Sequence, residues 1–323
     1  MKILVTGAAG FIASNLIKRL LDAGNQVVAI DNFFLGKINH IDRYLTNPNF
    51  KFFNFDLLNL DGLNKIFKES SPDRVWHLAA NSDISYGEKF TNFDLKGGTL
   101  VTYNVLESMR LCGCKELLFS SSGAVYGEPT THPTPENYGP LMPISLYAGS
   151  KLACEGLVSS YSHSFGIQAW MFRFGNVVGP NPTHGVIYDF VNRLLDDRTH
   201  LKILGDGTQT KPYMHVEDCL DGMQFAQLHS NEDINFFNLA APDQTSVNSI
   251  ASWILSEMGI SADECDISFT GGKRGWRGDV PFVNLDTKKM TTLGWTPKLK
   301  SDEAVKKAIH EIVVQLIDSK KRG

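Results

Sequence analysis

The chain has little cysteine and no long apolar run. Its five cysteines form no Cys-x-x-Cys pair, and their odd number does not suggest a disulfide framework, so we expect a protein of the reducing cytoplasm. No segment approaches the roughly 18 uninterrupted apolar residues that a membrane span requires. Met1 and Lys2 lead directly into the first predicted strand, without an apolar targeting region. These absences predict a soluble protein that binds no membrane.

Basic clusters, internal repeats and low-complexity tracts are missing as well. A net charge of -4 over 323 residues argues against nucleic acid as the main partner. The histidines are scattered, and His77, at the end of an apolar run, is expected to be a packed residue, so we predict no metal site. The length allows one large domain or two modest ones, and we expect two lobes.

Strand-like and helical runs alternate along the first half of the chain. This alternation predicts an α/β fold with a doubly wound parallel sheet. From Gly175 on, glycine and proline punctuate shorter runs, with strand candidates at 201–204 and 235–239, so we expect a second lobe interleaved with the first. In the first half we expect strands at 3–6, 27–30, 50–55, 74–78 and 168–174 and another ending at Phe119, and helices at 11–23, 99–111 and from 146 onward.

A glycine segment lies between the first predicted strand and the helix that follows it. Gly7 and Gly10 lack side chains at the point where backbone amides would approach a pyrophosphate, and the helix amino terminus adds a favourable positive potential. The third position of this Gly-x-x-Gly-x-x-Gly pattern is Ala13, which is small enough for close helix packing. The segment therefore predicts a dinucleotide phosphate site.

Two aspartates end the next two predicted strands. Asp31 can accept hydrogen bonds from the hydroxyls of an adenosine ribose and would repel an additional phosphate there, which favours NAD over NADP. Asp56 ends the third strand, where it either contacts the cofactor or caps the following helix. NAD is thus the cofactor that the amino-terminal segment predicts.

Ser122, Tyr147 and Lys151 carry the candidate chemistry. Ser122 follows a run that is expected to be a buried parallel strand, which delivers its hydroxyl to the carboxyl edge of the sheet, where ligands bind. Tyr147 and Lys151 are four residues apart and share one helix face, so the ammonium is expected to favour the phenolate. The tyrosine would then act as a proton carrier. The alternative interpretation makes Ser122 a loop hydroxyl and Tyr147 a packed helix residue.

An ordered set of short motifs extends over nearly the whole chain. It comprises Gly7-x-x-Gly10, Asp31-Asn32, His77-Leu-Ala-Ala80, Ser120-Ser-Ser-Gly-Ala-Val-Tyr126-Gly127, Tyr147-Ala-Gly-Ser-Lys151, Arg173-Phe-Gly-Asn176, Gly205-Asp-Gly-Thr208 and Gly278-Asp279. The set resembles the extended short-chain dehydrogenase/reductase family, in particular its NAD-dependent nucleotide-sugar epimerases and dehydratases and, most closely, UDP-glucose 4-epimerase-like enzymes. The resemblance implies a Rossmann domain for NAD at 1–176, with 213–241 returning to it, and a smaller domain at 177–323 that mainly binds the nucleotide sugar.

The resemblance also assigns roles at the cofactor. It implies that Ser122 hydrogen-bonds to the reacting sugar oxygen, that Tyr147 is the acid and base, and that Lys151 holds the nicotinamide ribose and tunes the tyrosine. The implied cofactor-binding residues are Gly7, Gly10, Phe11, Ile12, Asp31, Asn32, Gly36, Asp56, Leu57, Leu78, Ala79, Ala80, Tyr147 and Lys151.

Further positions are implied to bind the substrate. Trp276 stands where many relatives have an arginine that contacts the diphosphate, which leaves Arg274 and Arg277 as candidates, and Arg274 is favoured. Gly98 replaces an asparagine that often contacts the sugar. Val283 stands where a tyrosine is common in epimerases restricted to plain hexoses, so we expect room for an N-acetyl group. Besides Ser122, the implied substrate-binding residues are Asn176, Val186, Ile187, Lys211, Arg274 and Val283.

Two positions beside the serine indicate the reaction. Sugar-nucleotide 4,6-dehydratases of this family place an Asp and a Glu there, whereas this chain has Gly123 and Ala124. Inversion at C4 through a 4-keto sugar is the expected reaction, and because many epimerases have threonine at position 124, a neighbouring hydroxyl or water is expected to contribute. The alternatives are dehydration, reduction or decarboxylation of a nucleotide sugar, or binding without catalysis. The resemblance also implies a homodimer that pairs the helices at 99–111 and 145–165, whose apolar faces could equally pack within one chain.

Overall fold

The computed structural model describes residues 1–261, 263–272, 280 and 282–322. The chain divides into two compact units, each assembled from separate stretches of sequence. Unit 1 contains Met1–Pro129, Glu136–Phe174 and Met223–Asn238, and unit 2 contains Thr130–Pro135, Gly175–Gly222 and the chain from Leu239 on. The chain therefore passes between the units several times.

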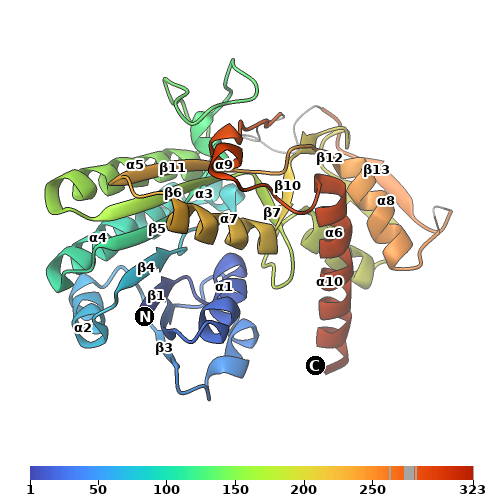
Figure 1. The fold of residues 1–323 in the computed structure, drawn as a ribbon. Coiled ribbons are helices and arrows are strands. Elements are labelled where there is room, and N and C mark those ends of the chain that lie inside the picture. The colour runs from blue at the N-terminus through green and yellow to red at the C-terminus, as the bar shows by residue number, and fades with distance from the viewer. Residues whose placement is uncertain (262, 273–279, 281, 323) are drawn as a thin grey trace. The chain divides into compact units, whose positions relative to one another are not determined.

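A seven-stranded sheet forms the centre of unit 1 (Figure 1). Its strand order is β11-β6-β5-β4-β1-β2-β3, and β1 to β6 pair in parallel. This arrangement confirms the predicted doubly wound parallel sheet, and the late strand β11 lies at one edge of it. The strands are β1 (Lys2–Thr6), β2 (Gln26–Asp31), β3 (Phe50–Asn54), β4 (Arg74–His77), β5 (Glu116–Ser122), β6 (Gln168–Phe174) and β11 (Ile234–Leu239).

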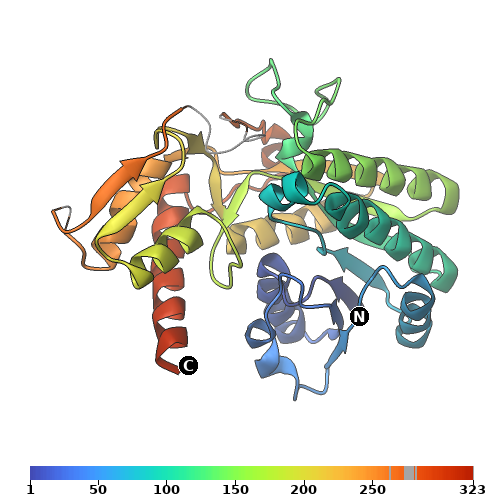
Figure 2. The ribbon, with the colours of Figure 1, turned by 180° about the vertical axis from the view of Figure 1, so that it is seen from behind.

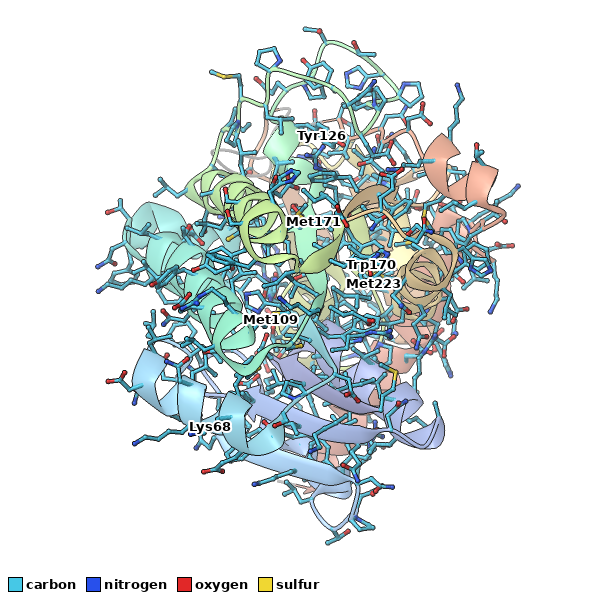
Figure 3. The ribbon with its side chains drawn as sticks, turned by 60° about the vertical axis from the view of Figure 1, so that its left-hand side comes forward. Lys68, Met109, Tyr126, Trp170, Met171 and Met223 are labelled. Atoms are coloured by element: carbon cyan, nitrogen blue, oxygen red, sulfur yellow. The ribbon has the colours of Figure 1, made fainter. Side chains whose placement is uncertain are left out.

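Helices cover both faces of this sheet, as a comparison of Figures 1 and 2 shows. One face packs against α2 (Leu60–Ser70), α4 (Val101–Cys112) and α5 (Leu146–Phe165), which share a hydrophobic core with it. Met109 of α4 and Met171 of β6 belong to this core, and Figure 3 labels both. The next residue back along the strand, Trp170, instead donates its indole N–H to Ser230 Oγ at 2.9 Å. Successive side chains of β6 thus point to opposite faces of the sheet.

Local signals fix the ends of the long helices in unit 1. The Ser145 side chain caps α5 by accepting the N–H of Ala148 at 3.2 Å, and Gly166, at φ 64°, ends the helix in the left-handed conformation. The predicted helix 99–111 begins differently, because residues Leu95–Leu100 form a π-helix, η3, that runs into α4. The other helices of this unit are α1 (Phe11–Asp22), α3 (Ile84–Lys89) and the 3-10 helices η1 (Ile38–His40), η2 (Asp42–Tyr44) and η4 (Gly123–Tyr126). Helix α7 (Val216–His229) belongs partly to each unit.

Unit 2 has its own core and three short sheets. Helices α6 (Val186–Asp196), α8 (Val247–Glu257) and α10 (Ser301–Arg322) contribute most of that core, and α9 (Lys288–Leu293) completes the set of helices described here. None of the helices described in either unit is long and apolar enough to cross a membrane. The strand pairs are β7 (Asn176–Val178) with β10 (Tyr213–His215), β8 (His200–Ile203) with β13 (Asp266–Phe269), and β9 (Thr210–Lys211) with β12 (Thr245–Ser246).

Candidate functional site

The glycine turn brings bare backbone close to the end of a neighbouring strand. Gly7 has φ +68°, and a Cβ added there would lie 2.8 Å from both N and Cα of Ala79, just beyond β4. Gly10 donates its N–H to the carbonyl of Gly7 at 2.9 Å, and α1 begins at Phe11. Only glycine fits at position 7, and the free N–H groups of the first helical turn lie at the site predicted to bind a pyrophosphate.

Asp31 ends β2 beside this turn and is buried. Its Oδ2 accepts the N–H of Ala9 at 2.9 Å, and its Oδ1 accepts the N–H of Phe33 at 2.7 Å. Burial raises the pKa of the Asp31 carboxyl, and the backbone hydrogen bonds oppose that shift. A Cβ on Gly36 would lie 3.0 Å from Oδ1, so the loop also packs closely here. The aspartate holds the glycine turn in place, a role that sequence analysis missed.

The remaining predicted cofactor residues follow strands β2, β3 and β4 or begin α1. Asp56 follows β3, and its Oδ1 accepts the N–H of Leu58 at 2.9 Å, whereas Asn59 is the residue that caps α2. The helix-cap interpretation of Asp56 is therefore wrong. The carbonyl of Leu57 accepts a hydrogen bond from Asn104 Nδ2 at 2.8 Å. Asn32 follows β2, the residues Leu78, Ala79 and Ala80 follow β4, and Phe11 and Ile12 begin α1.

Ser122, Tyr147 and Lys151 come together within unit 1. Ser122 is the last residue of β5, and its Oγ accepts the N–H of Ala124 at 3.2 Å and hydrogen-bonds with Tyr147. Lys151 lies one helical turn after Tyr147 in α5 and is buried; its Nζ donates to the carbonyl of Ser120 at 2.5 Å and lies 5.9 Å from the centre of the Tyr147 ring. The hydroxyl, the phenol and the ammonium therefore form one cluster at the carboxyl edge of the sheet.

The electrostatics of this cluster differ from the sequence-based expectation. Burial raises the pKa of Tyr147 to about 12, although the hydrogen bond with Ser122 opposes the shift. Burial also lowers the pKa of Lys151 to about 8. The ammonium is directed to the Ser120 carbonyl, so it does not produce the predicted lowering of the tyrosine pKa. Additional positive charge is needed before Tyr147 can act as a base near neutral pH.

A buried ion pair supports the strand end that carries Ser122. Arg173 of β6 binds Glu155 of α5 with two N–H groups, at 2.9 and 2.7 Å, and its third nitrogen donates to the hydroxyl of Tyr126 at 2.9 Å. Ser121 donates to the same carboxylate at 2.6 Å. The pair thus joins α5, β6 and the end of β5. Its sequence signal is weak: Arg173 is the one charged residue of the largely apolar β6, but Glu155 shares α5 with Lys151 and several serines.

Apart from Ser122, the predicted substrate residues that the structure describes lie in unit 2. Asn176 begins β7, Val186 and Ile187 begin α6, and Lys211 lies in β9. The Nζ of Lys211 donates to the carbonyl of Val280. The carbonyl of Val283 accepts a hydrogen bond from Gln244 at 2.9 Å. Arg274 lies outside the described residues.

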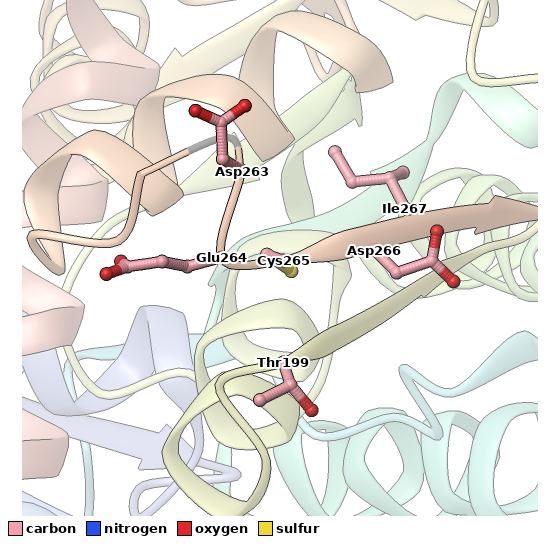
Figure 4. A pocket seen from close by; sticks show the side chains of 6 residues that line it. All are labelled: Thr199, Asp263, Glu264, Cys265, Asp266 and Ile267. Atoms are coloured by element: carbon pink, nitrogen blue, oxygen red, sulfur yellow. The ribbon is translucent and has the colours of Figure 1, made fainter.

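Unit 2 also has a surface pocket that none of these residues lines. Thr199, Asp263 and Cys265 are among its lining residues, and the pocket lies beside the paired strands β8 and β13 (Figure 4). No group of histidine, cysteine and acidic side chains in the described part of the chain is placed to hold a metal ion. The candidate chemistry therefore lies with the cluster in unit 1.

The fold and this cluster define an extended short-chain dehydrogenase/reductase with a Rossmann sheet. The family model "NAD dependent epimerase/dehydratase family" matches residues 3–240, and the chain belongs to this family. Its cofactor is NAD. The glycine turn and the carboxylate of Asp31 suit a dinucleotide of this kind.

Curated relatives and solved structures extend this likeness to nearly the whole chain. A putative UDP-glucose 4-epimerase of Methanocaldococcus jannaschii is 33% identical, covering 95% of this chain and 97% of that protein. UDP-glucose 4-epimerase of Mycolicibacterium smegmatis is 31% identical, covering 96% and 97%. The structure of UDP-glucose 4-epimerase from Thermotoga maritima has a TM-score of 0.87 at 28% identity, covering 98% and 100%. Other similar proteins are named as UDP-glucuronic acid 4-epimerase, UDP-N-acetylglucosamine 4-epimerase and UDP-glucuronic acid decarboxylase.

Proposed function

We propose that this protein is an NAD-dependent epimerase that inverts C4 of a nucleotide sugar, with a UDP-hexose or a UDP-N-acetylhexosamine as substrate. The observation that carries the proposal is the cluster of Ser122, Tyr147 and Lys151, with Gly123 and Ala124 beside it. In this cluster a single residue, Tyr147, serves as both acid and base. Elimination of water from the sugar requires a further acid and base, and neither Gly123 nor Ala124 has a side chain that can serve.

The residues of the chain divide the proton chemistry between them. Tyr147 removes the proton of the C4 hydroxyl and later returns it, while Ser122 hydrogen-bonds to the reacting oxygen. Lys151 binds the nicotinamide ribose, and its ammonium favours the tyrosinate only together with the positive charge of the bound cofactor. Bound NAD would supply the acceptor and donor of the C4 hydride and, through its positive ring, the additional charge that Tyr147 needs. Between the two hydride transfers the 4-keto sugar rotates and presents its other face. The net reaction is therefore an inversion at C4 without a second redox substrate.

Residues of unit 2 are proposed to bind the nucleotide and the sugar. Lys211 and Arg274 would neutralise the diphosphate, Asn176 would hydrogen-bond to it, and Val186 with Ile187 would contact the nucleotide. We also propose a homodimer, which several exposed apolar side chains of unit 1 support. These side chains lie on η3, α4 and α5: Leu100, Tyr103, Leu111, Leu146 and Phe165.

A substrate panel tests the function directly. The purified protein is incubated with UDP-, GDP- and dTDP-sugars, including UDP-glucuronic acid, and the products are identified by NMR. We expect a mixture of C4 epimers with no net change in NAD. A 4-keto-6-deoxy sugar, a pentose with release of carbon dioxide, or binding without any product would instead support the dehydratase, the decarboxylase or the non-catalytic alternative.

Replacing Asp31 with alanine is expected to reduce the preference for NAD over NADP. The change removes the proposed acceptor for the ribose hydroxyls and the negative charge that repels an additional phosphate. It also removes the bonds to Ala9 and Phe33, so affinity for NAD should fall as well. Calorimetry with both dinucleotides measures the effect, with Asp22→Ala, on the exposed end of α1, as the control. An unchanged preference, or NADP released from the denatured wild type, contradicts the assignment.

Val283 leads to a prediction about substrate size. Its small side chain leaves room for an acetamido group but offers no hydrogen bond to it, so the wild type should tolerate UDP-N-acetylglucosamine without preferring it. Val283→Tyr should selectively suppress turnover of the acetylated sugar, and Val283→Ile serves as the matched control. Turnover of both sugars is followed by NMR. Rejection of UDP-N-acetylglucosamine by a wild type that readily converts UDP-glucose, or an equal loss of both activities, rules out the prediction.

A further inference from the structure

Asp94 is a buried acidic residue that the proposed reaction does not use. It directly precedes η3 and is 2% exposed. Its Oδ1 accepts a hydrogen bond from the side-chain amide of Asn81 at 2.9 Å, and no donor among the described residues reaches its buried Oδ2. A buried carboxylate with one oxygen unsatisfied is costly unless a positive charge compensates it.

The surroundings of Asp94 fix it against the helix that carries the catalytic cluster. Ser150 of α5 donates its hydroxyl to the backbone carbonyl of Asp94 at 2.7 Å. A Cβ added to Gly87 would collide with Oδ2 of Asp94 and would lie 3.5 Å from the Cβ of Leu146. The carboxylate therefore lies close to the first turn of α5, the helix that carries Tyr147 and Lys151.

Lys151 is a buried cation without a dedicated carboxylate. Its Nζ donates to a neutral acceptor, the carbonyl of Ser120. Glu155 faces Lys151, but both of its oxygens already bind Arg173. Asp94 acts electrostatically on Lys151 without a direct ion pair between them, and no cation among the described residues binds its carboxylate. The other titratable groups facing Lys151 are held uncharged by burial: burial raises the pKa of Cys154 and that of Tyr147, the latter to about 12, and lowers the pKa of His77 to about 3.

We propose that Asp94 is the counter-ion of Lys151, a positioning residue that keeps the lysine charged beside Tyr147. Buried charges in proteins are paired, and this assignment leaves neither Lys151 nor Asp94 without an opposite charge. Burial raises the pKa of the Asp94 carboxyl and Asp83, in the same loop, adds to that shift, whereas the Asn81 amide and Lys151 oppose it. The consequence for catalysis rests on the proposed function, but the pairing itself does not.

The pairing is tested by titrating Lys151. Burial lowers its pKa to about 8, within reach of NMR on protein with carbon-13 in the lysine ε position, and the Lys151→Arg variant identifies the signal by its loss. In Asp94→Asn, which keeps the acceptor for Asn81, the midpoint should fall by roughly 0.5 to 1.5 pH units, because the attraction that favours the ammonium is gone. Asp83→Asn removes a charge from the same loop and should move the midpoint by less than about 0.3 units.

An unchanged midpoint in Asp94→Asn, or an equal fall in Asp83→Asn, overturns the proposal. If Asp94→Asn does not fold, Asp94→Ser makes the same change of charge with a smaller side chain. The pH dependence of epimerisation gives a second measurement. Because Asp94 also opposes ionisation of Tyr147, both limbs of the profile should move to lower pH in Asp94→Asn. A wild type that epimerises nothing refutes the proposed function alone, since the lysine titration still decides whether Asp94 is the counter-ion.

Discussion

Replacing Tyr147 with phenylalanine is expected to lower turnover of the nucleotide sugar by about 100- to 10,000-fold while the protein remains folded. The substitution removes the hydroxyl that hydrogen-bonds with Ser122 and keeps the aromatic ring near Lys151. No other described side chain is proposed to move this proton. Turnover is measured by NMR, folding by circular dichroism and thermal unfolding, and NAD affinity by calorimetry.

The control for this experiment is Tyr103→Phe, which removes a phenolic hydroxyl from the exposed face of α4. It should leave turnover close to that of the wild type. NAD affinity should also be nearly unchanged in Tyr147→Phe, because the change affects proton transfer rather than the contacts with the dinucleotide. Near-normal turnover in a folded Tyr147→Phe protein rules out the acid and base role.

Replacing Arg173 with methionine should destabilise the protein by about 3 to 5 kcal/mol. The side chains of Arg173 and Glu155 are 5% and 4% exposed, so the substitution leaves a carboxylate buried without its cation. Tyr126 then loses its hydrogen bond from Arg173, and Ser121 is left bonded to a carboxylate that has lost its cation. Equilibrium unfolding in urea measures the change, provided that the transition is cooperative.

Two further variants separate burial from charge pairing. The double variant Arg173→Met with Glu155→Leu should recover part of the lost stability, because no isolated charge remains in the core. Arg74→Met breaks the more exposed pair with Glu116, whose side chains are 15% and 34% exposed, and should cost clearly less. A loss in Arg173→Met no greater than that in Arg74→Met would show that the buried pair contributes little.

The sequence predicts the central sheet well because its signals are local. Buried parallel strands are short, nearly continuous apolar runs, and the strand expected to end at Phe119 is found as β5, although it continues to Ser122. The spacing of Tyr147 and Lys151 places both on α5, and Gly7 has the left-handed conformation that only glycine adopts readily. Each of these predictions depends on residues within a few positions of one another.

The rest depends on contacts between distant segments. The π-helical turn before α4 is such a case, since a Cβ on Gly98 would collide with the hydroxyl of Ser150, which is 52 residues away in sequence. The sequence shows that Glu155 and Arg173 are charged but not that they pair. The pKa of Tyr147 likewise follows from burial, which the spacing of two residues does not reveal.

The late position of β11 in the sequence affects how the central sheet forms during synthesis of the chain. Strand β11 ends at residue 239 of 323, and its Phe237 stacks on Phe172 of β6. While the ribosome is still producing the residues in between, β6 is an open edge, and open edges pair readily with other chains. We therefore expect a nascent chain that has passed Phe174 to need a chaperone until β11 emerges, and a fragment ending at Phe174 to aggregate.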